Sequence, residues 1–144
     1  MQLKNLIIDS KSAWVDFPGM PGFSVQVVNL SRKELTGLRK RCVTQKLDRK
    51  TRQMEEVLDE DKFVVEFTHA TISGWKGLTL EYLETLLLID TEGKDLSQEL
   101  PFTSENAEIL VGQSTEFDSW LNEVVFDLDN FRTVSDDRDV GTSN

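Results

Sequence analysis

The sequence has very little of the residues from which catalytic and metal sites are most often built. Its 144 residues include one cysteine, Cys42, and one histidine, His69. A single thiol forms no disulfide within the chain, which suits a reducing compartment. One cysteine and one histidine also fall short of the four ligands of a structural zinc site. We therefore expect neither a metal ion nor a cofactor.

Long apolar runs are lacking as well. The longest is Leu86–Ile89, which is far shorter than the roughly 20 residues of a membrane-spanning helix. The first ten residues lack the apolar core of a signal peptide. We therefore expect no membrane partner and a protein that stays in the compartment where it is made.

Catalytic motifs are also missing. The sequence contains no Gly-x-Ser-x-Gly turn, no P-loop and no dinucleotide-binding glycine pattern. The cations around Cys42 favour a reactive thiolate, but a cysteine in such a helix more often packs as a small apolar group. His69 has no identifiable partner and fits a structural role. The protein is therefore not expected to be an enzyme.

What the sequence has instead is a strong and uneven charge. The formal net charge is −10, yet residues 32–52 hold nine of the sixteen basic residues and only two acidic ones, Glu34 and Asp48. This basic window carries +7 and the remainder −17. Such a chain attracts an acidic partner, above all another copy of itself, so we predict a homo-oligomer. The protein-binding residues expected in the window are Arg39, Lys40, Arg41, Arg49, Lys50 and Arg52.

Nucleic acid is a poorer fit as the partner of the basic window. Nine cations could neutralise several phosphates. The window has no aromatic side chain for base stacking, however, and the rest of the chain would repel a polyanion. We therefore expect a protein partner.

Apolar periodicity predicts a single α+β domain, in which an N-terminal β-hairpin region packs on about four α-helices. Alternation at 13–17 and 23–27, around a Pro/Gly-rich turn, predicts the hairpin. A second, polar hairpin is predicted from 43–47 and 52–57. Helices are predicted after a Ser31/Glu34 capping box, from Asp59 to about Ser73 with Gly74 ending or kinking it, after Thr79, from Thr103 or Ser104 to Gly112, and from Ser114 to Phe131.

The last predicted helix has the most continuous apolar face. Its members are Phe117, Trp120, Leu121, Val124, Val125, Leu128 and Phe131. Two interpretations remain open. Either the whole face packs in the core, or part of it, with Trp120, Leu128 and Phe131, binds a partner. Of the three tryptophans, Trp14, Trp75 and Trp120, we expect two in the core. Residues 133–144 are polar and predict a disordered tail after a domain of residues 1–132.

Six landmarks follow one another in an order that suggests a family. They are Trp14–Gly19 with Gly22 and Phe23, Leu30–Leu35 with Leu38–Lys40, Leu47–Gln53, Gly74–Leu78, Ser104–Ala107, and Glu116–Trp120 leading to Asn130 and Phe131. In this order, over residues 13–132, the chain resembles the tail assembly chaperones of long-tailed, siphovirus-type bacteriophages. The family has no catalytic residues to carry over.

The resemblance implies a function and partners. Such a chaperone binds the tape measure protein in the host cytoplasm, helps recruit tail tube subunits around it, and is absent from the mature virion. Three alternatives remain open at this stage. They are a structural tail component retained in the virion (a tail-completion or tube-associated protein), an enzyme of unknown type, and a nucleic-acid-binding regulator.

Overall fold

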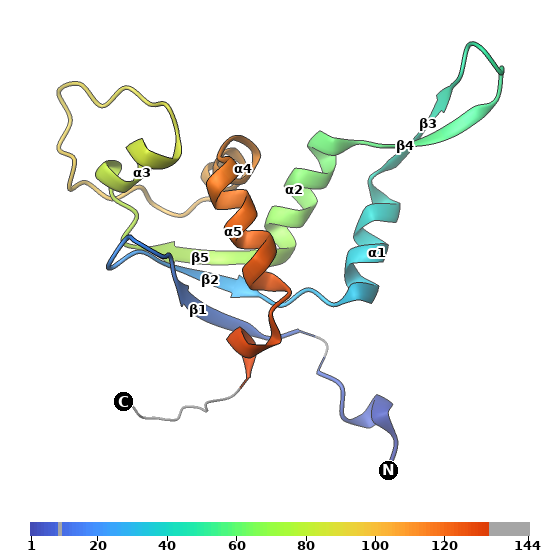
Figure 1. The fold of residues 1–144 in the computed structure, drawn as a ribbon, viewed down its shortest axis with the longest axis horizontal. Helices are drawn as coiled ribbons and strands as arrows, with labels where there is room; N and C mark the ends of the chain where they lie inside the picture. Colours follow the sequence, from blue (N-terminus) through green and yellow to red (C-terminus); the bar gives the residue numbers. More distant parts are fainter. Residues whose placement is uncertain (9, 133–144) are drawn as a thin grey trace.

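The computed structural model describes residues 1–8 and 10–132 (Figure 1). Its body is built on an antiparallel sheet of three strands: β1 (Ser12–Asp16), β2 (Ser24–Val28) and β5 (Ile72–Lys76), in the order β1-β2-β5. β1 and β2 pair over five residues, from Ser12 opposite Val28 to Asp16 opposite Ser24. The turn between them contains Gly19 and Gly22, both with positive φ, as the Pro/Gly-rich segment predicts.

The two faces of this sheet differ, because successive side chains of a strand point to opposite sides. Val25 and Val27 lie on the inner face and are fully buried. Trp14 lies on the outer face, where it is half exposed and the Nζ of Lys76 stands 4.6 Å from its ring centroid. Trp75 and Trp120 are buried, so two of the three tryptophans lie in the core, as expected.

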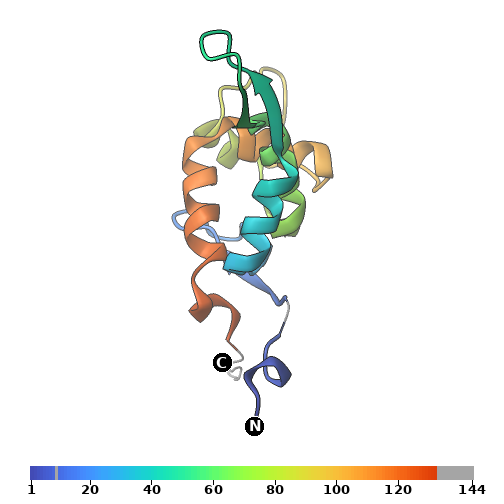
Figure 2. The same cartoon turned by 90° about the vertical axis from the view of Figure 1, so that its right-hand side faces the viewer.

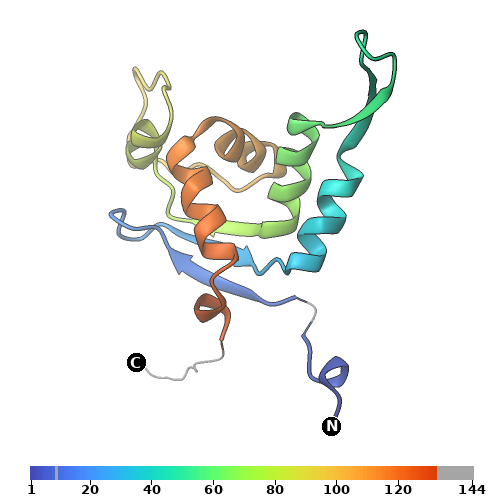
Figure 3. The same ribbon diagram turned by 45° about the vertical axis from the view of Figure 1, so that its right-hand side comes forward.

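Three helices cover the inner face: α2 (Glu60–Thr71), α4 (Ser104–Gln113) and α5 (Thr115–Val125) (Figures 1 and 3). Aromatic rings fill the space between α5 and the sheet. Phe17 lies 4.9 Å from Trp120 and 5.9 Å from Phe117 between ring centroids, and Phe23 lies 5.5 Å from Phe17. These rings join the N-terminal hairpin to the C-terminal helix and form the centre of the core.

Two further helices flank this body. α1 (Arg32–Arg41) packs beside α2, and α3 (Leu80–Leu86) lies at the far end of the sheet (Figure 1). Each of the five α-helices begins at a residue whose side-chain oxygen accepts a backbone N–H three positions on. These caps are Ser31, Asp59, Thr79, Thr103 and Ser114. At α1 the capping box is complete, since Glu34 Oε1 accepts the N–H of Ser31 at 3.0 Å. The predicted α+β architecture is confirmed.

The predicted end of the second helix was wrong. α2 ends at Thr71, and Ile72–Lys76 form β5, which pairs with β2. A bulge at Ser73 shifts the register, and Gly74 lies within the strand rather than at a helix end. A Cβ at Gly74 would stand 3.5 Å from Gln26 Oε1 and 3.9 Å from the Trp14 ring, which are ordinary van der Waals contacts. Pairing with β2, which is distant in the sequence, therefore determines that these residues form a strand.

The last helix also ends earlier than predicted. α5 stops at Val125, and a separate 3₁₀ turn, η2 (Leu128–Phe131), follows it. Side-chain hydrogen bonds occupy the last helical carbonyls: the side chain of Asn130 donates to Val124 O at 3.1 Å, and that of Asn29 donates to Val125 O at 2.9 Å. These bonds satisfy carbonyls that further helical turns would otherwise use.

The polar hairpin predicted in the basic window is confirmed. Its strands, β3 (Val43–Leu47) and β4 (Met54–Leu58), form a separate two-stranded sheet that projects from the body beyond α1 and α2 (Figures 1 and 2). The N-terminal arm, residues 1–8 with the 3₁₀ turn η1 (Leu3–Asn5), extends from another side of the body (Figure 1). The tail predicted at 133–144 lies outside the described residues.

Candidate protein-binding surfaces

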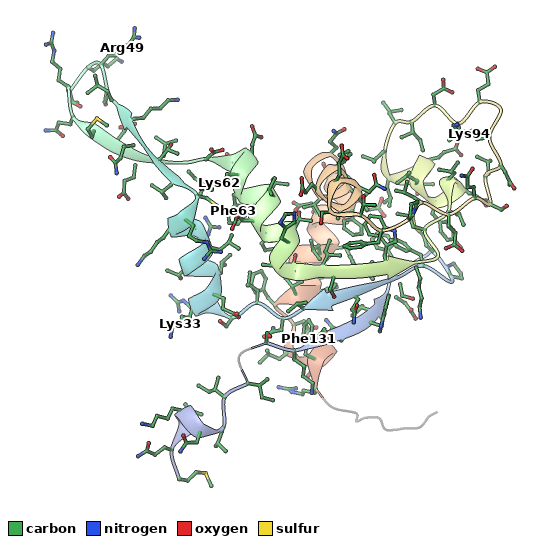
Figure 4. The ribbon with its side chains drawn as sticks, turned by 180° about the vertical axis from the view of Figure 1, so that it is seen from behind. Lys33, Arg49, Lys62, Phe63, Lys94 and Phe131 are labelled. Atoms are coloured by element: carbon green, nitrogen blue, oxygen red, sulfur yellow. The ribbon has the colours of Figure 1, made fainter. Side chains whose placement is uncertain are left out.

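The cations predicted at 49–52 lie at the tip of the projecting hairpin (Figure 4). Asp48 Oδ1 accepts the N–H of Lys50 at 2.9 Å, and Asp48 O accepts the N–H of Arg52 at 2.7 Å. Arg52 closes the turn in the left-handed region, at φ 59°. The side chains of Arg49, Lys50 and Arg52 are exposed and make no ion pair within the described residues. They are free to meet an acidic partner.

The cations predicted at 39–41 lie elsewhere, on the last turn of α1. Positive side chains are favourable at this end of a helix, where the carbonyls leave a partial negative charge. The guanidinium of Arg39 stands 5.3 Å from the ring centroid of Phe63, and Arg41 pairs with Glu66 at 3.5 Å. Both contacts join α1 to α2, although both arginines remain exposed. Lys40 is exposed beside them.

An apolar pair that the sequence reasoning passed over lies next to the hairpin tip. Leu47 and Met54 face each other across β3 and β4, with 58% and 59% of their surfaces exposed. No described helix covers this hairpin, since every residue from Thr44 to Glu56 except Asp48 is exposed. The signal was present in the sequence: alternation places Val43, Gln45 and Leu47 on one face of their strand.

A second apolar surface surrounds the two ends of the described chain. Besides Met1, four large aliphatic side chains of the arm are exposed: Leu3, Leu6, Ile7 and Ile8. Between the arm and α1 runs an open groove of about 800 Å³, whose apolar lining includes Ile7, Leu30 and Leu38. A smaller hollow of about 370 Å³ lies between Ile8, Leu128 and Phe131. We call the exposed arm side chains, together with Leu128, the terminal apolar surface.

The three binding residues predicted on the last helix have different positions. Trp120 is buried against Phe17 and Phe117, so it belongs to the core. Phe131 is 6% exposed and forms part of the floor of the small hollow. Leu128 is 56% exposed at its rim. Of the three, Leu128 is the one whose surface is free for a partner.

An acidic end lies opposite the hairpin, around α3 and the loop that follows it (Figures 1 and 4). Residues 81–99 contain one cation, Lys94, and the exposed carboxylates Glu81, Glu84, Asp90, Glu92, Asp95 and Glu99. The Ser97 hydroxyl and backbone N–H both donate to Asp95, which lowers the pKa of that carboxyl and keeps it ionised. Leu88, Ile89 and Leu96 are exposed among these charges.

Cys42 and His69, the two residues considered for chemistry, have different surroundings. Cys42 is fully buried at the end of α1, so its thiol packs as an apolar group. His69 has a partner that the sequence did not reveal: its Nε2 lies 2.5 Å from Glu108 Oε2, and this exposed pair joins α2 to α4. Within residues 1–8 and 10–132 there is no cluster of three metal-ligating side chains. Nor is any helix of that part long and apolar enough to cross a membrane.

Comparison with known proteins identifies no relative: no family model, no curated protein and no solved structure matches this chain.

Proposed function

We propose that this protein is a tail assembly chaperone of a long-tailed bacteriophage. It binds the tape measure protein in the host cytoplasm, helps recruit tail tube subunits around it, and leaves before the virion is complete. The order of landmarks along residues 13–132 supports this proposal. The observation that carries it is the terminal apolar surface, whose side chains are exposed.

An exposed apolar surface of this kind suits a helical client. A soluble monomer rarely leaves a contiguous apolar patch in water unless the patch binds something. Five large aliphatic side chains contribute here: Leu3, Leu6, Ile7, Ile8 and Leu128. Beside them the groove along α1 is open and partly apolar. Amphipathic helices bind in such grooves through side chains spaced three or four residues apart, and a long helical tape measure protein would present many such segments.

The charge of the chain fits a chaperone that must keep its client in solution. The net charge of −10 opposes aggregation, because molecules of like net charge repel one another. When a client covers the terminal apolar surface, the acidic end around α3 still faces the solvent. A complex of many copies on one client would therefore stay soluble.

Co-expression with the tape measure protein of the same phage tests this proposal. The wild-type protein should keep the tape measure protein in the soluble fraction. A variant that combines Ile7→Ser, Ile8→Ser and Leu128→Ser should lose this effect while its melting temperature stays within a few degrees of wild type, since these side chains are exposed. The matched control is Ile109→Ser, which removes an exposed aliphatic side chain from α4 and should keep the client soluble.

Two results would contradict the proposal. One is a triple variant that keeps the tape measure protein as soluble as wild type does. The other is the presence of the protein at stoichiometric amounts in purified virions, measured by mass spectrometry, which would favour a structural tail component instead.

A further inference from the structure

The projecting hairpin is a strand pair without a covering layer. An isolated two-stranded hairpin is marginally stable in water, and stable sheets gain their energy from a packed apolar face. The hairpin of β3 and β4 has such a face in the Leu47–Met54 pair, but nothing in the described part of the chain packs on it. It also ends in cations that have no ion-pair partner there. Both features indicate a surface that binds another molecule.

The charge of the hairpin tip is complementary to that of the opposite end of the molecule. Residues 46–52 hold four cations and one carboxylate, Asp48, and so carry +3. Residues 81–99 hold six carboxylates and one cation and so carry −5. Each end also exposes aliphatic side chains, Leu47 and Met54 at the hairpin and Leu88, Ile89 and Leu96 at the acidic end. The two ends match in both charge and apolar character.

The two ends cannot meet within one molecule. They lie at opposite ends of its long axis, with the hairpin beyond α1 and the acidic loop beyond α3 (Figures 1 and 4). A hairpin can therefore reach an acidic end only on a second copy. We propose that the β3–β4 hairpin of one copy docks on α3 and the following loop of the next copy.

An interface of this kind joins two different patches head to tail. A docked pair keeps one free hairpin and one free acidic end, so further copies can add. Repeated heterologous contacts close into a ring or continue as an open helical array, depending on the rotation between neighbours. The interface is separate from the terminal apolar surface, so it needs no client, and purified protein alone is enough to test it.

A second copy explains the hairpin better than a nucleic acid does. Residues 43–58 contain no aromatic side chain on which a base could stack. Glu55 and Glu56 lie on β4 beside the tip and would repel phosphates. The exposed Leu47–Met54 pair gains nothing from a phosphate backbone, whereas it would be buried against Leu88 and Ile89 of a neighbour.

Two charge-reversal variants of the full chain test the interface. The hairpin variant combines Arg49→Glu with Lys50→Glu. The loop variant combines Glu81→Lys with Glu92→Lys, whose side chains make no hydrogen bond or ion pair within the described residues. The control, Arg32→Glu with Lys33→Glu, makes the same charge change on the first turn of α1. Sedimentation velocity over a concentration series measures association of each variant.

The wild type and the control should associate as concentration rises. Each reversal variant alone should associate at least about tenfold more weakly, because like charges then face each other across the contact. An equimolar mixture of the two variants should recover the affinity, since the reversed hairpin now fits the reversed loop. Wild-type affinity should fall as salt rises from about 0.1 M to about 1 M, where the Debye length shrinks from about 10 Å to about 3 Å.

Several outcomes would overturn the proposal. A wild-type protein that stays monomeric at low salt has no such interface. Variants that associate as tightly as wild type, or a mixture that fails to recover, show that these two ends do not meet. Binding of nonspecific duplex DNA that is lost in the hairpin variant, with self-association unchanged, would assign the hairpin to nucleic acid instead.

Discussion

Two antiparallel strand pairs of equal length lie in very different surroundings in this molecule. β1 and β2 pair over five residues, and so do β3 and β4. In the first pair Val25 and Val27 are fully buried under helices, whereas in the second Leu47 and Met54 are more than half exposed. Backbone pairing is similar in both, so we expect the first pair to be the more stable because of the packed layer that covers it.

The molecule therefore consists of a packed body and the projecting β3–β4 hairpin. The body around the Phe17–Phe117 contact is fixed by the N-terminal hairpin and the C-terminal helix together. The β3–β4 hairpin joins the end of α1 to the start of α2, and we expect it to open without disturbing that core. A mutation should therefore have a large effect on global stability in the body and a small effect in the projection.

The largest expected effect is that of Phe117→Ala in the body. Phe117 is fully buried, and its ring lies 5.6 Å from that of Trp120 and 6.5 Å from that of Phe23. Its removal leaves a cavity and should lower the free energy of unfolding by about 3–5 kcal/mol. Urea unfolding followed by circular dichroism measures this loss. Leu47→Ala in the hairpin should change the same quantity by less than about 0.5 kcal/mol, and equal losses would refute the comparison.

A smaller loss is expected at Gly77, where two segments of the body approach each other closely. A Cβ added at Gly77 would stand 1.9 Å from the carbonyl oxygen of Gly22, and φ is +79°. Gly93, in the exposed acidic loop, has the same φ but open space around it. Gly93→Ala should therefore cost about 1 kcal/mol for the left-handed backbone alone, and Gly77→Ala distinctly more. Thermal unfolding of both variants checks this, and equal costs would show that the close approach is absent.

Much of this fold follows from local chemistry that the sequence displays. The caps at Ser31, Asp59 and Ser114 are short-range hydrogen bonds, and each begins a helix where the sequence predicts it. β5 could not be predicted in this way. Its residues continue a helical pattern after Thr71, and only pairing with β2, more than forty residues earlier, makes them a strand. The early end of α5 has the same kind of cause, since Asn29 caps it from afar.

The binding surfaces were predictable to a lesser degree. The charge and alternation patterns of the sequence predict that Arg49 and Lys50 lie on a polar hairpin, because both patterns can be read without the fold. They did not reveal that Arg39 and Arg41 contact α2, since those contacts depend on how two helices pack. Nor did the apolar face of the last helix distinguish Leu128 from Phe131, whose different exposure depends on the turn after Val125.

The hairpin should respond locally to Arg52→Gly. Arg52 has a φ of 59°, a conformation that costs a non-glycine residue roughly 1 kcal/mol and glycine almost nothing. The substitution should therefore make the hairpin open less often, and amides of β3 and β4 should exchange a few fold more slowly with deuterium. The free energy of global unfolding should stay unchanged, because the hairpin is not part of the core. A change in global stability as large as the local one would show that hairpin and body unfold together.

The smallest effect is expected at the carboxyl group of Asp118, which the body partly buries. Partial burial on α5 raises the pKa of Asp118, and the hydrogen bond from Asn122 only partly offsets this. A carboxyl whose pKa is raised by folding favours the folded state while it is protonated, and this contribution is lost as pH rises through the folded pKa. Asp118→Asn removes the ionisation and should stabilise the protein at about pH 7, by less than about 0.5 kcal/mol because the group is only partly buried. At about pH 3 Asp118 is mostly protonated in both states, so the gain should shrink there. Urea unfolding at both pH values measures the difference, with Glu55→Gln on the exposed hairpin as the control. A gain that is larger in acid than at neutral pH would mean that contacts other than desolvation determine the behaviour of this carboxyl.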